Sequence, residues 1–276
     1  MAKLNRLGWT AGTAISTYGI RVGIRANDEA VLTELSERLP PGWKSSRSTY
    51  VDRLYSVILG VDRPGSRRRR FHLLYDGLQR LARTRHLEEV HARFENSLQS
   101  LVASSARRRI FVHAGVVGWR GRAIVLPGRS FSGKSTMVSA LLKAGATYYS
   151  DEFAVLDERG RVHPYAKPLS LRGGGEEPPR KCNAEAFGSV VGAKPLPVGL
   201  VAVSQYEEGA RWRPRKLSPG RAVLALLANT VPARNAPERA LRTLRKTLAS
   251  TTALAGRRGE ADESVDLLLN MVDGND

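Results

Sequence analysis

The stretch GRSFSGKST, residues 128–136, lies between the apolar run AIVLP (123–127) and the run MVSALLKAGA (137–146). It satisfies the pattern G-x-x-x-x-G-K-[ST] completely, and its flanks predict the strand and the helix that such a phosphate-binding loop requires. The glycines let backbone N–H groups turn inward around a phosphate, and the N-terminus of the following helix adds partial positive charge. The stretch therefore predicts a nucleotide-binding domain of the α/β class.

The candidate nucleotide contacts are the residues of this loop. Lys134 supplies a positive charge for the β- and γ-phosphates of a nucleotide, and the Ser135 hydroxyl is an oxygen ligand for Mg²⁺. The loop thus predicts ATP and Mg²⁺ as cofactors. The alternative, a glycine-rich turn with an incidental lysine, is less favoured because a strand enters and a helix leaves. The predicted contacts are Gly128, Arg129, Ser130, Phe131, Ser132, Gly133, Lys134, Ser135 and Thr136.

Two acids, Asp151 and Glu152, lie in the stretch TYYSDEFAVLD (147–157), which predicts a strand. A strand that follows the helix returns its carboxyl end to the loop, where ligands collect in open α/β sheets. Adjacent residues of a strand point to opposite faces, so we expect the two acids to have different tasks. One would orient Mg²⁺ or polarise a nucleophile, and the other would pack or bond elsewhere. A pair of solvated turn acids is the alternative.

His113 lies inside the apolar run IFVHAGVV (110–117). A single histidine in such a strand is more often a core residue with satisfied hydrogen bonds than a ligand. The other histidines show no metal-ligand spacing, and the chain has one cysteine, Cys182. The residues alone therefore predict no metal site built on histidine or cysteine.

The composition is that of a soluble globular protein, with 42% hydrophobic and 25% charged residues among 276. No apolar run approaches the roughly 20 residues that cross a bilayer, and a single cysteine cannot form an internal disulfide. We expect a cytoplasmic protein with no membrane partner.

The chain is strongly basic, with 44 Lys and Arg against 26 Asp and Glu, a formal net charge of +18. Such a charge suits a nucleic-acid backbone, or an acidic or phosphorylated ligand, or it reflects a general use of arginine at surface positions. The clusters at 67–70 and 107–109 are short, and no nucleic-acid-binding motif accompanies them. Nucleic acid is therefore the less favoured partner.

The first part of the chain, residues 1–105, predicts a small α/β N-terminal domain. Residues 18–26 alternate as a half-buried strand does, and residues 28–39 combine an acidic first turn with apolar positions at helical spacing. Residues 50–60 predict one or two further strands. Apolar residues recur at helical spacing over 74–105, which predicts one long helix or two.

The second part, residues 106–276, predicts the catalytic domain. A hairpin is expected over 110–128 with its turn at Arg120-Gly121, followed by the loop and a helix that ends at Gly145. The glycine- and proline-rich residues 169–181 predict a mobile loop. Further strands are expected at 162–166 and 199–208, and helices at 218–230, 237–256 and 263–273.

The runs VHAGVV (112–117), GRSFSGKST and LLKAGATYYSDE (141–152) together resemble the catalytic domain of bacterial HPr kinase/phosphorylase and its relatives. That family has a histidine before the loop, a GxxxxGKS loop, and an acidic pair after the end of the next helix. The intervals fit, because His113 precedes Gly128 by 15 residues and Asp151 follows Ser135 by 16. The resemblance covers about residues 108–157. The later runs YAKPLSLR and LLANT are similar to the HPr-kinase-related group, whose kinases occur in peptide-modification clusters, including those for lasso peptides.

The resemblance implies a P-loop kinase domain of the HPr kinase/phosphoenolpyruvate carboxykinase type. It implies transfer of a phosphoryl group from ATP to a serine hydroxyl of a peptide, protein or small molecule, with peptide tailoring as the first expectation. Relatives form oligomers, so a homo-oligomer is a further expectation. The N-terminal domain would take part in substrate capture.

The family roles pass to matching positions of this chain. Asp151 matches the general base, and Glu152 matches the second, metal-binding acid, although HPr kinases usually have Asp there. His113 matches the histidine near the active site, and Lys134 and Ser135 match the phosphate lysine and the magnesium serine. Arg172 matches an arginine of the family that would contact the substrate. In the family a metal-binding glutamate stands two residues before this arginine, and this chain has Ser170 at that position.

A third departure from the family concerns the docking of the substrate, and two alternative functions stay open. The element with which HPr kinase docks its protein substrate and reverses the reaction has no counterpart, so neither HPr nor a phosphorylase activity is implied. A P-loop ATPase or nucleotide-sensing regulator is the main alternative function, and a basic nucleic-acid-binding protein is the lesser one. The acceptor and any donor other than ATP stay open.

Overall fold

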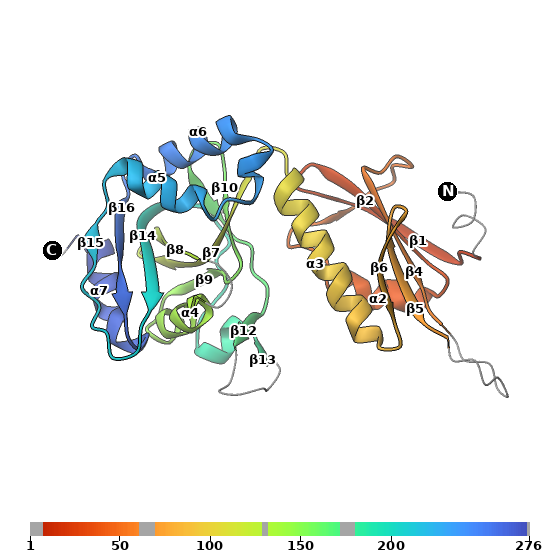
Figure 1. The fold of residues 1–276 in the computed structure, drawn as a ribbon, viewed down its shortest axis with the longest axis horizontal. Coiled ribbons are helices and arrows are strands. Elements are labelled where there is room, and N and C mark those ends of the chain that lie inside the picture. The colour runs from red at the N-terminus through yellow and green to blue at the C-terminus, as the bar shows by residue number, and fades with distance from the viewer. Residues whose placement is uncertain (1–7, 61–69, 129–131, 172–179, 275–276) are drawn as a thin grey trace. The chain divides into compact units, whose positions relative to one another are not determined.

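The computed structural model of the chain describes residues 8–60, 70–128, 132–171 and 180–274. The chain divides into two compact units, Met1–Arg107 and Arg108–Asp276. The sequence placed this boundary after residue 105. Each unit combines sheets and helices, so the prediction of an α/β protein is confirmed at that level (Figure 1).

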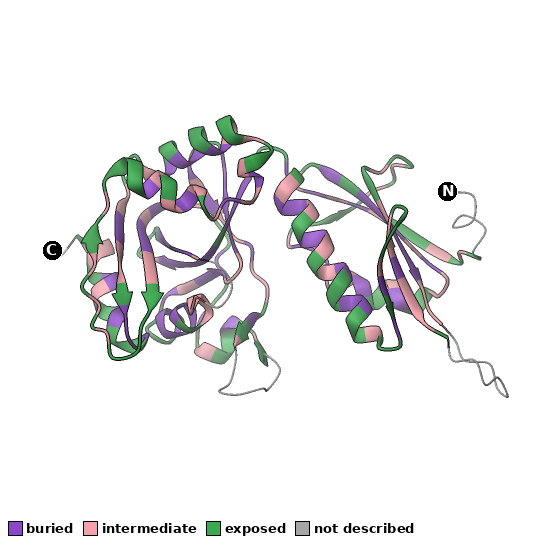
Figure 2. Ribbon diagram, viewed as in Figure 1, coloured by how far each residue is buried: buried purple, intermediate pink, exposed green. Residues whose placement is uncertain are grey.

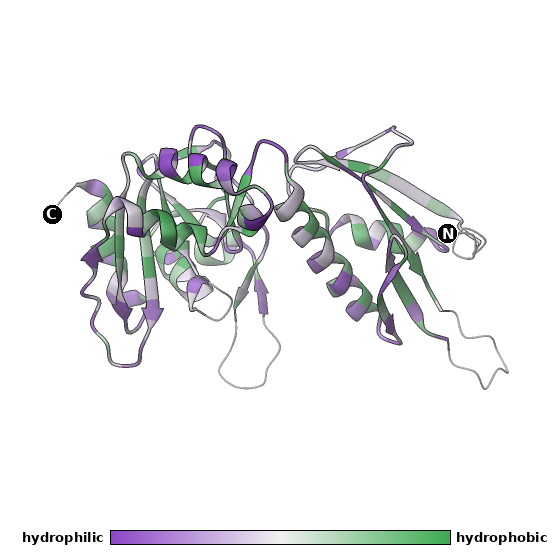
Figure 3. Cartoon of the chain, turned by 45° about the horizontal axis from the view of Figure 1, so that its top comes forward, coloured by the Kyte–Doolittle hydropathy of each residue, from purple (hydrophilic) through white to green (hydrophobic). Residues whose placement is uncertain are grey.

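The described part of unit 1 contains a six-stranded sheet of order β3-β1-β2-β4-β5-β6, in which only β2 and β4 pair in parallel. Helix α2 packs against β1 and β2, and α3 packs against β5 and β6. Helix α3 has a hydrophilic and a hydrophobic side, as an amphipathic surface helix does (Figure 3). The strands are β1 (Ala11–Thr17), β2 (Ile20–Ala26), β3 (Lys44–Ser45), β4 (Arg53–Ile58), β5 (His72–Asp76) and β6 (Gln79–Thr84), and the helices are α2 (Glu29–Ser36) and α3 (Leu87–Ser105).

The prediction of helix over 74–105 is wrong for its first part. Strands β5 and β6 form an antiparallel hairpin, and only α3 is helical. The turn is made by Gly77 and Leu78, and the φ of 57° at Gly77 suits glycine. Strand β5 also pairs with β4, a non-local partner. Strand β1 was not predicted, and it pairs with β2 across a turn at Tyr18 and Gly19.

Unit 2 is built around an eight-stranded sheet of order β11-β10-β7-β8-β14-β16-β15, with β9 also paired to β7. Strands β8, β14 and β16 are parallel to one another. The strands are β7 (Ile110–Trp119), β8 (Arg122–Pro127), β9 (Thr147–Ser150), β10 (Phe153–Leu156), β11 (Arg161–His163), β14 (Leu196–Tyr206), β15 (Arg215–Lys216) and β16 (Thr252–Arg258), with a separate pair β12 (Leu169–Leu171) and β13 (Arg180–Cys182). The helices are α4 (Lys134–Lys143), α5 (Pro219–Leu227), α6 (Pro237–Leu248) and α7 (Asp262–Asp273), with short 3-10 turns at Ala184–Phe187 and Val231–Arg234.

Two hydrophobic cores lie on the two faces of this sheet. Ile124 and Leu126 of β8 pack with α4 and α7, whereas Ala123 and Val125 pack with α5 and α6. The alternation places successive side chains of one strand in different cores. Figure 2 shows the strands of this unit as mainly buried. The sheet is therefore covered on both faces, which gives a rigid frame for the loops at its edge.

Several predicted elements of unit 2 are confirmed and two are wrong. The hairpin with its turn at Arg120-Gly121 and the helix after the phosphate loop are present. The stretch 147–157 is not one strand, because Asp151 and Glu152 interrupt it between β9 and β10. The predicted helix 237–256 ends at Leu248, and β16 follows.

The change from helix to strand after Leu248 has a physical cause. The Thr251 hydroxyl donates to the carbonyls of Thr247 and Val198, which ties the end of α6 to β14. Ala253 and Leu254 then become buried between two other strands, β14 and β15. The partners lie some 50 residues away in sequence, so helical spacing alone could not reveal the strand.

A further difference concerns the predicted loop at 169–181. The ends of that loop form the pair β12 and β13, while residues 172–179 lie outside the described part of the chain. Across the ranges that the structure describes, none of the helices has the length and apolar character needed to span a bilayer.

Candidate functional site

Three strand segments meet at one edge of the unit 2 sheet. Strand β7 runs antiparallel to β8, β9 and β10, with Ala114 opposite Pro127, Val116 opposite Ser150, and His113 opposite Phe153. The carboxyl ends of β8 and β9 therefore lie beside the same part of β7. This register brings the phosphate loop, the acidic pair and His113 to a single edge.

The described part of the phosphate loop is held by backbone contacts. Gly128 N–H donates to the His113 carbonyl at 3.2 Å, which joins the start of the loop to β7. Gly133 has a φ of 78° and directly precedes α4, a left-handed conformation that favours glycine. Lys134, Ser135 and Thr136 thus form the first turn of α4. The predicted contacts Arg129, Ser130 and Phe131 lie outside the described residues.

Ser135 and Asp151 are in direct contact. Ser135 Oγ donates a hydrogen bond to Asp151 Oδ2 at 2.7 Å, and the backbone N–H of Ser170 reaches the same oxygen at 3.5 Å. Asp151 Oδ1 is buried and has no hydrogen-bond partner within the described ranges. Burial raises the pKa of Asp151, while the Ser135 hydrogen bond and the Lys134 charge act against the rise. The carboxylate is thus more basic than that of an ordinary aspartate.

The acidic pair lies in a bend and not within a strand. Ser150 Oγ accepts hydrogen bonds from the backbone N–H groups of Glu152 and Phe153, which fixes the bend between β9 and β10. The rule that successive strand residues point to opposite faces therefore does not apply to Asp151 and Glu152. Burial lowers the pKa of Lys134, and the charges of Asp151 and Glu152 oppose this. Both acids accordingly act on the lysine of the loop.

His113 has an exposed side chain, with its ring 4.7 Å from that of Phe153. Its backbone N–H donates to the Asn229 carbonyl. Partial burial lowers the pKa of His113 below 6.5, and the Lys134 charge lowers it further. A neutral imidazole is therefore favoured beside the loop.

Arg258, which the sequence did not predict, lies beneath the loop at the carboxyl end of β16. Its side chain is 2% exposed and donates to the carbonyls of Gly133 and Gly259, each at 2.9 Å. Its Nε has no hydrogen-bond partner in the described part of the chain. Strand β16 is parallel to β14, which is parallel to β8. The carboxyl end of β16 therefore lies at the same edge of the sheet as the carboxyl end of β8, where the phosphate loop begins. Recognition of residues 252–258 as a strand would have revealed this arginine.

The donor set suits magnesium bound together with a nucleotide. Mg²⁺ usually takes one or two protein oxygens and completes its shell with water and phosphate oxygens. The hydroxyl of Ser135, the carboxylate of Asp151 with its unpartnered oxygen, and Glu152 offer such ligands. Among the residues that the structure describes, no group of three or more His, Cys, Asp and Glu side chains could hold a metal by itself. The predicted substrate residue Arg172 lies outside those residues.

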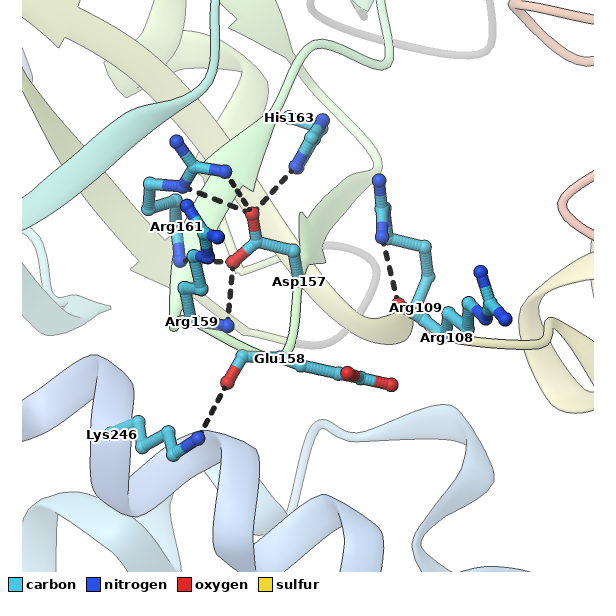
Figure 4. Close-up of polar contacts among 8 residues, drawn as sticks. All are labelled: Arg108, Arg109, Asp157, Glu158, Arg159, Arg161, His163 and Lys246. Atoms are coloured by element: carbon cyan, nitrogen blue, oxygen red, sulfur yellow. Dashed lines mark hydrogen bonds and ion pairs between the residues drawn. The ribbon is translucent and has the colours of Figure 1, made fainter.

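A second polar cluster surrounds Asp157 at the turn between β10 and β11 (Figure 4). Its carboxylate accepts from the backbone N–H of Arg159, from the backbone and guanidinium of Arg161, and lies 3.0 Å from His163 Nε2. Burial alone would raise the pKa of Asp157, but these contacts outweigh it and lower the pKa to about 2. Lys246 of α6 donates to the Glu158 carbonyl at 3.1 Å. The cluster therefore stabilises the turn and joins it to α6.

Comparison with known proteins adds no further assignment. No family model matches the chain, and no curated protein matches it in sequence. The functional interpretation consequently depends on the loop motif and on the geometry of Ser135, Asp151, Lys134 and Arg258.

Proposed function

We propose that this chain is an ATP- and Mg²⁺-dependent P-loop kinase of the HPr-kinase-like type. In this proposal it transfers the γ-phosphoryl group of ATP to a serine hydroxyl of a peptide, a protein or a small molecule. The observation that supports it most is the hydrogen bond between Ser135 of the phosphate loop and Asp151, a buried carboxylate with a raised pKa. A phosphate-binding group and a proton acceptor therefore lie side by side.

Positioning and charge neutralisation account for most of the catalysis in phosphoryl transfer. Lys134 and the N-terminus of α4 face the place where the β- and γ-phosphates would lie. Arg258 donates to the Gly133 carbonyl and so holds the residue that directly precedes α4. When bound, Mg²⁺ would neutralise charge on the phosphates, with Ser135 and Glu152 as its protein ligands.

Asp151 would accept the proton of the serine acceptor. The hydroxyl oxygen forms a bond to the γ-phosphorus as the bond to the β-phosphate oxygen breaks and ADP leaves. The hydroxyl proton passes to the Asp151 carboxylate late in this step. The raised pKa of Asp151 favours this role, because a stronger base retains the proton more readily. His113, neutral and next to the loop, would assist in orienting the phosphate or the acceptor.

A P-loop ATPase or nucleotide-sensing regulator is the second candidate. It would use the same phosphate loop, but water would take the place of the serine hydroxyl. The two functions differ in a measurable way, because a kinase should hydrolyse ATP slowly alone and transfer the phosphoryl group when it receives an acceptor.

The proposal is tested with the full chain, radiolabelled ATP, Mg²⁺ and serine-containing peptides. We expect Asp151→Asn to lower transfer by a factor of about 10²–10⁴, the usual contribution of a general base, and to leave nucleotide affinity nearly unchanged. Asp266→Asn, which alters an exposed carboxylate of α7 in the same unit, is the matched control. Full transfer by Asp151→Asn would contradict the proton-acceptor role. Hydrolysis that is equally fast with and without every acceptor would favour the ATPase.

A further inference from the structure

The sheet of unit 1 carries its helices on one side. Tyr55 of β4 packs against Phe94 of α3, with ring centroids 5.1 Å apart in an edge-on geometry. Helix α2 lies on the same side, because Glu34 Oε2 of α2 is 3.2 Å from His91 Nε2 of α3. Both helices of the described part of this unit therefore cover the same face.

The other side of this sheet is here called the open face. Ser56 follows Tyr55 in β4 and so points away from the helices, and its Oγ accepts a 2.9 Å hydrogen bond from Arg25 Nε. The strand register and ring contacts place a set of basic residues on this face. They are Arg21 and Arg25 of β2, Lys44 of β3, Arg80 and Arg83 of β6, and Arg85 directly after β6.

Negative charge is concentrated on the opposite side of the unit. Most of its described acids lie in the two helices or at their ends, and Asp76 lies opposite Tyr55, on the row that faces the helices. Asp52 is the exception, and it is bound to the backbone N–H of Arg21 at 2.7 Å. The acids of the helices and their ends are Asp28, Glu29, Glu34, Glu37, Glu88, Glu89 and Glu95. The sheet thus separates a basic face from an acidic one.

Aromatic rings hold the arginines of the open face in place. The Arg25 guanidinium carbon lies 4.3 Å from the ring centroid of Trp9, and that of Arg83 lies 3.8 Å from the centroid of Phe71. Arg85 lies 5.5 Å from the same Phe71 ring. Stacking restricts the orientation of the planar guanidinium and leaves the N–H groups at its edge able to bind another group. Less conformational entropy is then lost when a carboxylate binds.

We propose that the open face binds an acidic segment of an extended peptide. Arg80, Arg83 and Arg85 are exposed, and none of the three forms an ion pair with another described residue. A guanidinium group can donate two parallel hydrogen bonds to one carboxylate. A row of Glu or Asp side chains is therefore the complementary partner. This proposal depends on the kinase function only in identifying the peptide as the phosphoryl acceptor.

A single-stranded nucleic acid fits this face less well. Such binding depends on aromatic rings whose faces can stack on bases. Here the rings of Trp9 and Phe71 already stack with guanidinium groups. The observations therefore favour carboxylates over bases as the groups that this surface recognises.

The size of the sheet determines the length of the test peptide. Neighbouring strands lie about 4.8 Å apart and an extended residue spans about 3.3 Å, so about eight residues cross the six strands. The probe is a fluorescein-labelled peptide of about this length in which glutamate alternates with serine and glycine. Binding to the full chain is measured by fluorescence anisotropy without ATP, so that the result does not depend on phosphoryl transfer.

We expect Arg83→Glu to weaken binding of the glutamate peptide by about tenfold, because it removes one attraction and adds a repulsion. Arg80→Glu, at another exposed position, should weaken it similarly and provides a second variant if the first folds poorly. Arg93→Glu changes the net charge equally, but on the outer side of α3, and should leave binding within about twofold. Thermal melts verify that each variant is folded.

Three results would overturn the proposal. The first is equal binding of a control peptide with glutamine in place of glutamate. The second is an equal loss of binding in Arg93→Glu. The third is tighter, strongly salt-dependent binding of a single-stranded oligonucleotide of the same charge through Arg83. If the peptide binds as expected but no peptide is phosphorylated, the docking surface stands and the kinase function fails.

Discussion

Ser135 Oγ lies 2.7 Å from Asp151 Oδ2 and donates a hydrogen bond to it. The contact joins the first turn of α4 to the bend that follows β9, across 16 residues of sequence. It connects the loop that we propose to bind phosphate with the acidic pair. The first two predictions follow from this pair.

The raised pKa of Asp151 predicts the pH dependence of transfer. The carboxylate must be ionised to accept a proton, and burial moves its pKa above 3.8. The rate should therefore fall on the acidic side at a pH higher than an ordinary aspartate would give. A pH profile of kcat/KM measures this limb. A limb at or below the ordinary aspartate pKa would show that Asp151 is not the group that titrates.

Ser135→Ala should increase the requirement for magnesium. The substitution removes one oxygen ligand and the shorter of the two hydrogen bonds to Asp151 Oδ2, leaving the Ser170 N–H at 3.5 Å. We expect the Mg²⁺ concentration at half-maximal activity to rise by about tenfold or more. Ser139→Ala, in the same helix, removes a hydroxyl that bonds only locally to the Thr136 carbonyl, and serves as the control. An unchanged magnesium titration in Ser135→Ala would argue against this ligand.

Arg258→Met should weaken nucleotide binding and destabilise unit 2. The variant removes the Arg258 hydrogen bond to the Gly133 carbonyl and leaves only the Met137 N–H as a donor, so the residue directly before α4 is held less firmly. A lost buried hydrogen bond from a charged group costs about 1.5–3 kcal/mol. Nucleotide titration and thermal unfolding measure the two effects. Arg257→Met removes an exposed arginine bound to Glu207 and should change neither by much.

Gly115→Ala tests how closely α4 packs against β7. An added Cβ at this position would lie 2.6 Å from Val138 Cγ2 of α4. We expect a loss of about 1–3 kcal/mol in the free energy of unfolding, the usual cost of overpacking. Val138→Ala removes the clashing methyl group, so the double variant should lose less than the sum of the two single variants. Strict additivity in a denaturant titration would contradict this contact.

Asp157 predicts a stability change at acid pH. Its folded pKa of about 2 lies below the ordinary 3.8, so its stabilising contribution is complete above the ordinary value. The contribution is lost as the pH falls from 3.8 toward 2. Because solvent screens part of the interaction, we expect Asp157→Asn to cost about 1 kcal/mol at neutral pH. The difference between variant and parent in the free energy of unfolding should shrink in that acid range, and a constant difference would contradict the prediction.

The local signals of the sequence were sufficient for part of the fold. The hairpin at Arg120-Gly121 and helix α4 followed from turn chemistry and periodicity, because both depend on residues close in sequence. The strands β5, β6 and β16 were missed within stretches of apparent helical spacing. Strand β5 pairs with β4 and β16 pairs with β14, both distant in sequence, whereas β6 pairs with its neighbour β5; these pairings outweigh local preference.

The sequence by itself determined which chemically active side chains the proposed site can use. Glycines let the backbone of a loop between a strand and a helix turn its N–H groups toward a phosphate, so GRSFSGKST predicts a phosphate site from neighbouring residues alone. Tertiary structure decided how the remaining groups are arranged. It placed Asp151 on Ser135, Arg258 beneath Gly133, and the basic residues of unit 1 on the face opposite its acidic helices. The physical reason is that strand order and register depend on pairing between distant segments, and these pairings decide which side chains meet at an edge or share a face.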